Sequence, residues 1–120
     1  MKKVLILLLT LVSITACADN VYYSNFVSHK QLVDSTWTDW TDWKESYTSI
    51  TIDSSDVTIS NNIYTIIGIG KHKDDYSETI IYLTKDSNNK HVTIRLRYQK
   101  DGIRQLYVDC ENIVTVYNLM

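Results

Sequence analysis

Apolar and polar residues alternate along most of the chain with the period of a β-strand. The clearest segment is residues 92–98, in which Thr93, Arg95 and Arg97 alternate with apolar side chains. Because successive side chains of a strand point to opposite faces, this segment predicts a strand with one buried and one exposed face. Six further segments lie between short clusters of Asp, Asn, Ser and Gly: residues 49–52, 57–59, 63–69, 79–84, 104–110 and 113–118. The pattern therefore predicts about seven strands.

The connections between these segments are short, which predicts that consecutive strands are neighbours. Asp101-Gly102 tolerates the positive φ angles of a two-residue type I′ hairpin, and Glu111-Asn112 turns the chain again. Such a sheet must bury one face, and closure into a barrel also removes its exposed edges. We predict an all-β fold, an antiparallel meander of about seven strands that forms a small barrel, with a two-layer β-sandwich as the alternative.

The N-terminal residues have a different character. Lys2 and Lys3 precede an apolar run at residues 4–12, and small or polar residues follow from Ser13. A positive end, an apolar stretch of about 7–15 residues and a small-residue cleavage site are typical of a secretory signal peptide. The run is shorter than the roughly 20 apolar residues of a membrane-spanning helix. Residues 1–16 are therefore predicted to be a signal peptide.

Two cleavage sites fit this signal. Ile14-Thr15-Ala16-Cys17 resembles a lipobox, the bacterial lipoprotein motif whose cysteine is acylated and becomes the new N-terminus. Cleavage after Ala18 by ordinary signal peptidase is the alternative, and it would release a soluble periplasmic or secreted protein. We favour cleavage before Cys17, which predicts an exported lipoprotein held at the membrane of the cell envelope by its acyl chains.

Removal of the signal leaves about a hundred residues, the size of one small domain. Residues 17–36 are predicted to be a tether or a first strand, and residues 37–120 a single β domain. Without the two lysines of the signal, ten basic side chains face 14 acidic ones, a net charge near −4 that argues against a nucleic-acid partner. Cys110 would then be the only cysteine of the folded part, which predicts a small buried apolar side chain rather than a disulfide.

Three short segments of the C-terminal half carry a resemblance. They are Thr93-Ile94-Arg95-Leu96, the Gln105-Leu106-Tyr107-Val108-Asp109 strand and the terminal Val116-Tyr117-Asn118. Together they resemble a group of uncharacterised small exported bacterial proteins, in which a tryptophan-containing segment follows the signal. The segment from Trp37 to Trp43 corresponds to it. The resemblance covers about half of the chain and implies an exported β domain, with no activity attached.

The most unusual feature is a repeated Thr-Asp-Trp unit that places Trp37, Trp40 and Trp43 within seven residues. One interpretation is an aromatic platform that stacks sugar rings or grips a partner, with Asp39 and Asp42 accepting hydrogen bonds. The other is that the three rings pack into one end of the barrel. We favour the second, because each tryptophan buries about 150–250 Å² and a small domain without a disulfide needs that area.

Arg95, Arg97 and Arg104 form a second candidate binding set. Arg95 and Arg97 share the exposed face of one predicted strand, and Arg104 begins the next strand. They could form a basic strip for a carboxylate-bearing partner or an anionic lipid. Cross-strand pairing with acidic side chains is the alternative, and we favour it.

No motif commits the chain to a reaction. His29, His72 and His91 are scattered, and no histidines or carboxylates have the spacing of metal ligands. The sequence lacks a nucleophile elbow and a glycine-rich phosphate loop. We therefore predict that the protein is not an enzyme and uses no cofactor or metal.

The sequence as a whole favours a non-catalytic binding module of the bacterial cell envelope that recognises an envelope protein or a glycan. A structural or assembly lipoprotein of an envelope complex is the alternative. An inhibitor of a hydrolase is a further alternative that suits the size and the compartment, but it rests on analogy alone.

Overall fold

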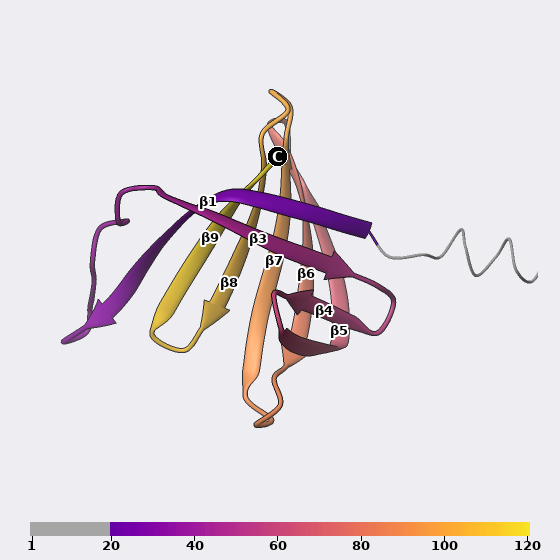
Figure 1. Ribbon diagram of the computed structural model, residues 1–120, viewed down its shortest axis with the longest axis horizontal. Helices are drawn as coiled ribbons and strands as arrows, with labels where there is room; N and C mark the ends of the chain where they lie inside the picture. The colour runs from indigo at the N-terminus through magenta and orange to yellow at the C-terminus, as the bar shows by residue number, and fades with distance from the viewer. Residues whose placement is uncertain (1–19) are drawn as a thin grey trace, which may run out of the picture.

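The computed structural model describes residues 20–120, which form one antiparallel sheet of nine strands (Figure 1). The strands are β1 (Asn20–Val33), β2 (Thr36–Trp37), β3 (Lys44–Ile52), β4 (Asp56–Ile59), β5 (Asn62–Lys73), β6 (Ser77–Lys85), β7 (His91–Gln99), β8 (Arg104–Cys110) and β9 (Ile113–Leu119). The predicted signal peptide, Cys17 and both candidate cleavage sites lie outside the described residues.

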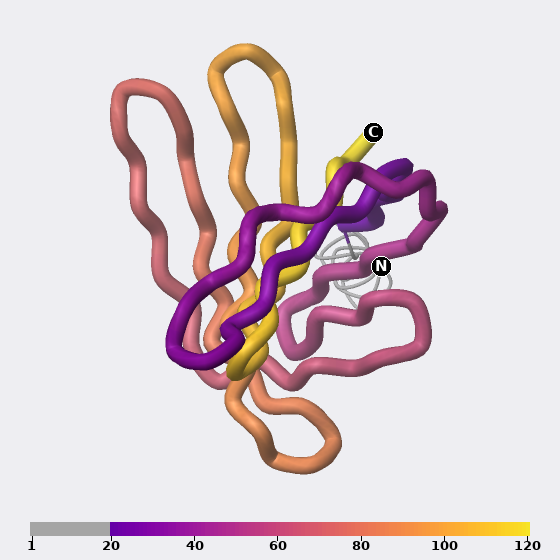
Figure 2. Tube along the Cα trace, turned by 90° about the vertical axis from the view of Figure 1, so that its left-hand side faces the viewer, coloured from indigo at the N-terminus to yellow at the C-terminus, as the bar shows by residue number. Residues whose placement is uncertain are grey.

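The strands from β3 to β9 follow one another in chain order, and β1 closes the sheet by pairing with both β3 and β9. The result is a ring rather than a regular barrel, with β2 attached to β1 as a short extra hairpin. The all-β antiparallel meander is therefore confirmed, and the seven predicted strands correspond to β3–β9. The β5–β6 and β7–β8 hairpins extend beyond the ring (Figure 2).

The interior of the ring is filled by the apolar side chains that alternate along these strands. On β7, Val92, Ile94 and Leu96 are almost fully buried, as their period-two pattern predicted. They face Leu106 and Val108 of β8 in the core cluster. Burial of each such side chain contributes about 1.5–3 kcal/mol. Cys110 packs partly buried against this core as a free thiol.

Aspartates stabilise several of the turns. Oδ1 of Asp74 accepts the backbone N–H groups of Tyr76 and Ser77, at 2.7 and 2.8 Å, in the β5–β6 turn. Asp53 accepts two N–H groups in the same way between β3 and β4. Because these donors favour the ionised carboxylate, the pKa values of both side chains lie below the usual value.

The β7–β8 turn differs from the prediction. Gln99 and Ile103 are joined by a hydrogen bond from the Gln99 N–H to the Ile103 carbonyl (2.9 Å), which leaves three residues in the loop. Only Gly102 among them has a positive φ, 93°. The predicted two-residue type I′ turn is therefore wrong. One extra residue lets the Asp101 carboxylate accept the Ile103 N–H (3.0 Å) and stabilise the wider loop.

A bulge in β1 reverses the direction of its side chains. Ser24 pairs with Leu119, an inward position of β9, whereas Phe26 pairs with Asn118, an outward one. The extra residue between them is Asn25, whose side chain accepts a hydrogen bond from the Asn118 amide (3.1 Å). A one-residue shift moves every following side chain to the other face. Even-numbered residues such as Ser24 therefore point inward before the bulge, and even-numbered residues such as Phe26 point outward after it.

Candidate functional site

The Thr-Asp-Trp repeat attaches the connection between β2 and β3 to the edge of β1. Thr38 donates its backbone N–H to the Gln31 carbonyl (2.8 Å), and its Oγ1 accepts the Gln31 N–H (2.9 Å). Thr41 does the same with His29, at 2.9 and 3.0 Å. Each threonine hydroxyl thus accepts the N–H that a backbone carbonyl would accept in a regular strand pair. Thr38 and Thr41 are three residues apart, whereas their partners Gln31 and His29 are two residues apart, so each repeat unit has one residue more than a regular strand would need.

The three tryptophans lie outside the core. Trp37, Trp40 and Trp43 are 43, 42 and 48% exposed. The interpretation that they pack into one end of the barrel is therefore wrong. The interior is already filled by strand residues, and the threonine attachments hold the tryptophan segment along β1. Trp40 and Trp43 instead line a cavity together with Val116, an outward residue of β9 that is only 4% exposed.

Two cations and three aromatic rings form a row beside this segment. The Lys30 ammonium lies 5.4 Å from the ring centre of Trp37 and 4.8 Å from that of Trp40. Trp40 meets Tyr107 of β8 edge to face, with 6.4 Å between ring centres. The Arg95 guanidinium lies 4.7 Å from the Tyr107 ring centre. Each cation–π contact at such a site contributes about 0.5–1 kcal/mol, so the row holds its rings in place.

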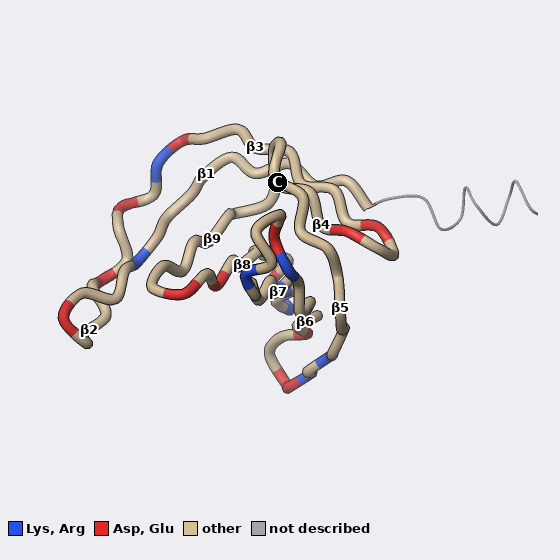
Figure 3. The backbone as a smooth tube through the Cα atoms, turned by 90° about the horizontal axis from the view of Figure 1, so that it is seen from below, with Lys and Arg blue, Asp and Glu red and all other residues tan. Residues whose placement is uncertain are grey.

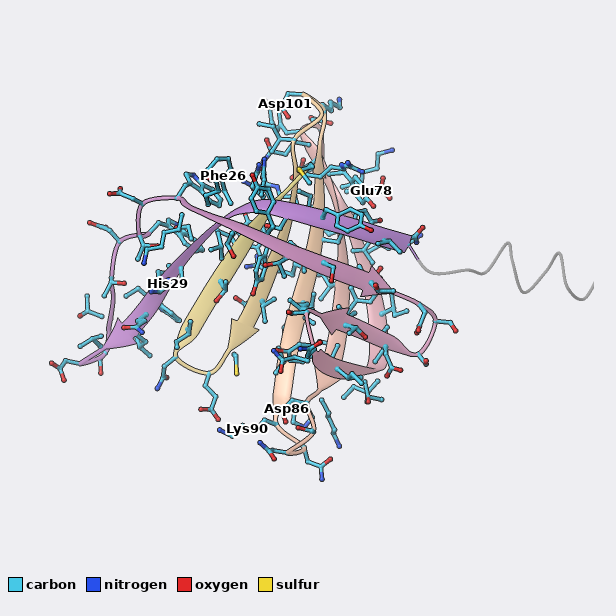
Figure 4. All side chains as sticks on the ribbon, in the orientation of Figure 1. Phe26, His29, Glu78, Asp86, Lys90 and Asp101 are labelled. Atoms are coloured by element: carbon cyan, nitrogen blue, oxygen red, sulfur yellow. The ribbon has the colours of Figure 1, made fainter. Side chains whose placement is uncertain are left out.

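Three adjoining cavities follow the same outer face, and together they form what we call the outer groove. The first, of about 370 Å³, lies between Phe26, Trp43 and Ile103, with the amides of Gln105 and Asn118 in its wall. This end of the groove is mostly apolar. Phe26 reaches it only because of the bulge in β1, and it lies toward the same end of the molecule as the β7–β8 turn (Figure 4).

The other two cavities continue the groove from the first. The second, of about 210 Å³, shares Trp43 and Gln105 with the first cavity and adds Trp40 and Tyr107. The third, of about 350 Å³, shares Trp40 and Tyr107 with the second and ends at Arg97. The groove therefore crosses the outer face of the sheet from β1 to β6.

The third cavity carries an excess of positive charge. Lys30, Arg95 and Arg97 line it, with Asp74 as the carboxylate among its lining residues. Nε of Arg95 lies 3.2 Å from Oδ2 of Asp109, but this N–H makes no hydrogen bond to any residue that the structure describes. Within residues 20–120, Lys30 and Arg97 form no ion pair. Acidic residues lie mostly in the turns (Figure 3), and the two carboxylates beside these cations are Asp74, which lines the cavity, and Asp109, which lies against Arg95.

No family model matches the chain. Neither a curated protein nor a solved structure matches it. The resemblance of its C-terminal half to small exported proteins therefore stays a prediction, and the function is argued from the geometry of the groove.

The structure brings together most of the predicted binding residues. Trp40, Trp43, Arg95 and Arg97 line the groove, and Trp37 lies beside it, against the Lys30 ammonium.

Arg104 lies apart from the groove. It pairs with Tyr98, an inward position of β7, and its guanidinium lies 5.9 Å from the Tyr22 ring centre. It also donates a hydrogen bond to the carbonyl of Met120. The predicted basic strip thus keeps two of its three arginines, because Arg104 lies two residues before Leu106 and therefore shares the inward face of β8.

Sequence reasoning missed the groove residues of β1 and β8. The hairpin register pairs Arg95 with Tyr107, so the outward position of Tyr107 could have been found from the two alternation patterns. Phe26 and Lys30 gave no such signal, because the bulge that turns them outward interrupts the alternation of β1.

Metal and membrane features do not define a site in the described part of the chain. Among residues 20–120, no three His, Cys, Asp or Glu side chains are grouped so that they could hold a metal ion. The same residues contain no helix of the length and apolar character needed to cross a membrane.

Proposed function

We propose that the protein is a non-catalytic binding module of the bacterial cell envelope and that the outer groove is its ligand site. The observation that carries this proposal is the continuity of the three cavities, which join exposed tryptophans to the cations Lys30, Arg95 and Arg97 across one face. Concave sites with a few convergent polar groups are typical ligand sites. Tryptophan and arginine are also the residues that contribute most often to binding energy at interfaces.

The lining of the groove supports binding rather than catalysis. Its carboxylate, Asp74, is hydrogen-bonded to the N–H groups of its own turn, which lower its pKa. A general acid or base works best with a pKa near the working pH, so this carboxylate is poorly suited to either role.

The predicted signal and lipobox support a place in the envelope. We propose that residues 1–16 are removed and that acylated Cys17 anchors the domain in the membrane. Only three residue steps separate Cys17 from Asn20, where β1 begins, a reach of about 10 Å in an extended chain. The domain would therefore stay close to the membrane surface.

A structural or assembly role is the second candidate, and one observation favours it. Ile67, the bulge residue of β5 between Ile66 and Gly68, and Leu83 of β6, which pairs with Gly68, are about half exposed although they are large and apolar. An exposed apolar patch of this kind is typical of a contact surface. None of its residues lines the groove, so the two roles can be tested separately.

The groove is tested by a binding titration. Soluble envelope glycans and envelope proteins are titrated against the purified protein by calorimetry, and Trp43→Ala is compared with Tyr47→Ala, which removes an exposed ring of β3 outside the groove. We expect saturable binding that Trp43→Ala weakens at least tenfold, because truncation of a hot-spot residue costs 2 kcal/mol or more. Tyr47→Ala is expected to bind normally. Saturable binding unchanged by Trp43→Ala, or no binding at all, would contradict the proposal.

A further inference from the structure

The two ends of the outer groove differ in chemistry, and we propose that its ligand is an acidic oligosaccharide. Its sugar rings would lie against Trp43 at the apolar end, and an anionic group of the chain would reach Arg97 at the basic end. The inference rests on the proposed function, and it adds the chemical class of the ligand.

The apolar end has the groups that a sugar ring needs. Trp43 separates the first two cavities, and within the described residues its ring makes no contact with another aromatic ring or a cation. It is 48% exposed and lines both cavities, whereas the rings of Trp37 and Trp40 already meet Lys30. A pyranose ring has apolar C–H faces and a rim of hydroxyls. The exposed Trp43 ring can pack against a C–H face, and the amides of Gln105 and Asn118 can hydrogen-bond to the hydroxyls.

The basic end is suited to an anion. Arg97 offers a planar set of N–H donors that matches carboxylate or phosphate oxygens. Lys30 lines the same cavity, and the Asp74 carboxylate opposes only part of this positive charge. The chain as a whole is acidic, so this local excess of positive charge is not a general property of the surface.

The length of the groove favours an oligomer over a single sugar. From β1 to β6 it crosses β9, β8 and β7, four strand spacings in all. At about 4.8 Å per spacing this amounts to almost 20 Å along the sheet. A chain of several sugar rings spans that distance, and it carries anionic groups at intervals.

The closed sheet disfavours an extended peptide as the occupant. Peptides often bind by adding a strand to an open sheet edge. Along the groove, β1 pairs with β3 and β9, and β8 pairs with β7 and β9, so these strands offer no open edge. The site works through side chains on a face of the sheet, as is expected for a ligand that brings its own hydroxyls and charges.

The test uses pairs of oligosaccharides that differ only in charge. Oligogalacturonate is compared with its methyl ester, hyaluronan fragments with their reduced neutral form, and phosphorylated mannan fragments with the dephosphorylated ones, all by calorimetry on the purified protein. We expect at least one acidic member to bind, and its neutral counterpart to bind at least about tenfold more weakly, since hydrogen bonds to charged groups are the stronger ones. The carboxylate and phosphate pairs distinguish the two kinds of anionic group.

Charge variants tie the binding to the basic end. Arg97→Gln is expected to remove the preference for the acidic member, lowering its affinity about 10- to 100-fold. Lys90→Gln removes the same charge from the exposed β6–β7 turn, toward the opposite end of the molecule (Figure 4), and is expected to bind normally. Asp74→Asn keeps an acceptor for its turn and removes the opposing charge. It is expected to raise the affinity for the acidic member about two- to fivefold.

The outcomes separate this inference from the proposed function. Equal binding of acidic and neutral members, or an acidic preference that Arg97→Gln leaves intact, would overturn the inference but not the groove. Binding of an envelope protein or of anionic lipid vesicles alone, lost in Trp43→Ala, would also overturn the inference while the groove remains a binding site. If nothing binds in a way that depends on Trp43, both proposals fail.

Discussion

Replacement of Leu96 by alanine is expected to destabilise the domain by about 2–5 kcal/mol, the range for such a truncation in a packed core. Leu96 is 1% exposed and lies between Ile80 of β6 and Leu106 of β8. Natural domains are stable by only about 5–15 kcal/mol. The substitution would therefore remove a large part of the total and lower the melting temperature by roughly 10 °C or more.

The measurement is urea unfolding followed by circular dichroism, with Ile63→Ala as the matched control. Ile63 is the second residue of β5 and is 57% exposed, so its truncation is expected to change stability by about 0.5 kcal/mol or less. Similar losses for the two variants would mean that the ring interior is not the core of the protein.

Deletion of Ser28 is expected to destabilise the protein by about 3–5 kcal/mol and to abolish ligand binding. Ser28 is a regular outward residue of β1 after the bulge at Asn25. If the bulge stays, the deletion turns Lys30 into the interior, where an unpaired charge is strongly destabilising. If the bulge is lost instead, Phe26 turns inward and leaves the groove that it lines.

Deletion of Asn25 is the control. It removes the extra residue of the bulge, so Tyr22 and Lys30 lie seven positions apart and a regular β1 keeps Tyr22 inward and Lys30 outward. The hydrogen bond between the Asn25 and Asn118 side chains is lost, so a loss of about 0.5–1.5 kcal/mol is expected, with binding retained. Unfolding curves and calorimetric titrations report both effects. Equal losses of stability and binding in the two deletion variants would show that Asn25 is not the residue at which β1 changes face.

Much of the fold could be predicted from the sequence because one face of each strand from β3 to β9 is apolar. The segment 92–98 is the clearest case, and its buried residues are those that the alternation placed inward. The closing strand β1 could not be recognised with the same certainty. Its alternation changes face at Asn25, and its inward side includes polar residues such as Ser24.

The sequence indicated several residues of the candidate site, because their types and spacing are unusual. It did not show which other residues lie around them in the fold. Trp40, Trp43, Arg95 and Arg97 were singled out by residue type and spacing, and they do line one groove. The expectation that the tryptophans are buried was wrong. It rested on the apolar area that a small domain must bury, and this total does not determine where any one ring lies. The hydrogen bonds from Thr38 and Thr41 to β1 determine the position of the tryptophan segment.

The attachment of the repeat to β1 could not be predicted from its residue types. Thr38 and Thr41 looked like spacers between tryptophans, yet each joins the segment to β1 by two hydrogen bonds. Such pairings follow from the register of β1 against its neighbour, which the repeat alone does not reveal. The spacing of the tryptophans is a consequence of that attachment.

The most direct test of the central claim, that the tryptophan segment forms an open groove on the outer face, is acrylamide quenching of the intrinsic fluorescence of the folded protein. All three tryptophans lie between residues 37 and 43, so the emission reports on this segment alone. We expect emission that acrylamide quenches readily while circular dichroism shows an intact sheet. Blue-shifted emission that resists quenching in the folded protein would place the rings in the core and would rule out an open groove.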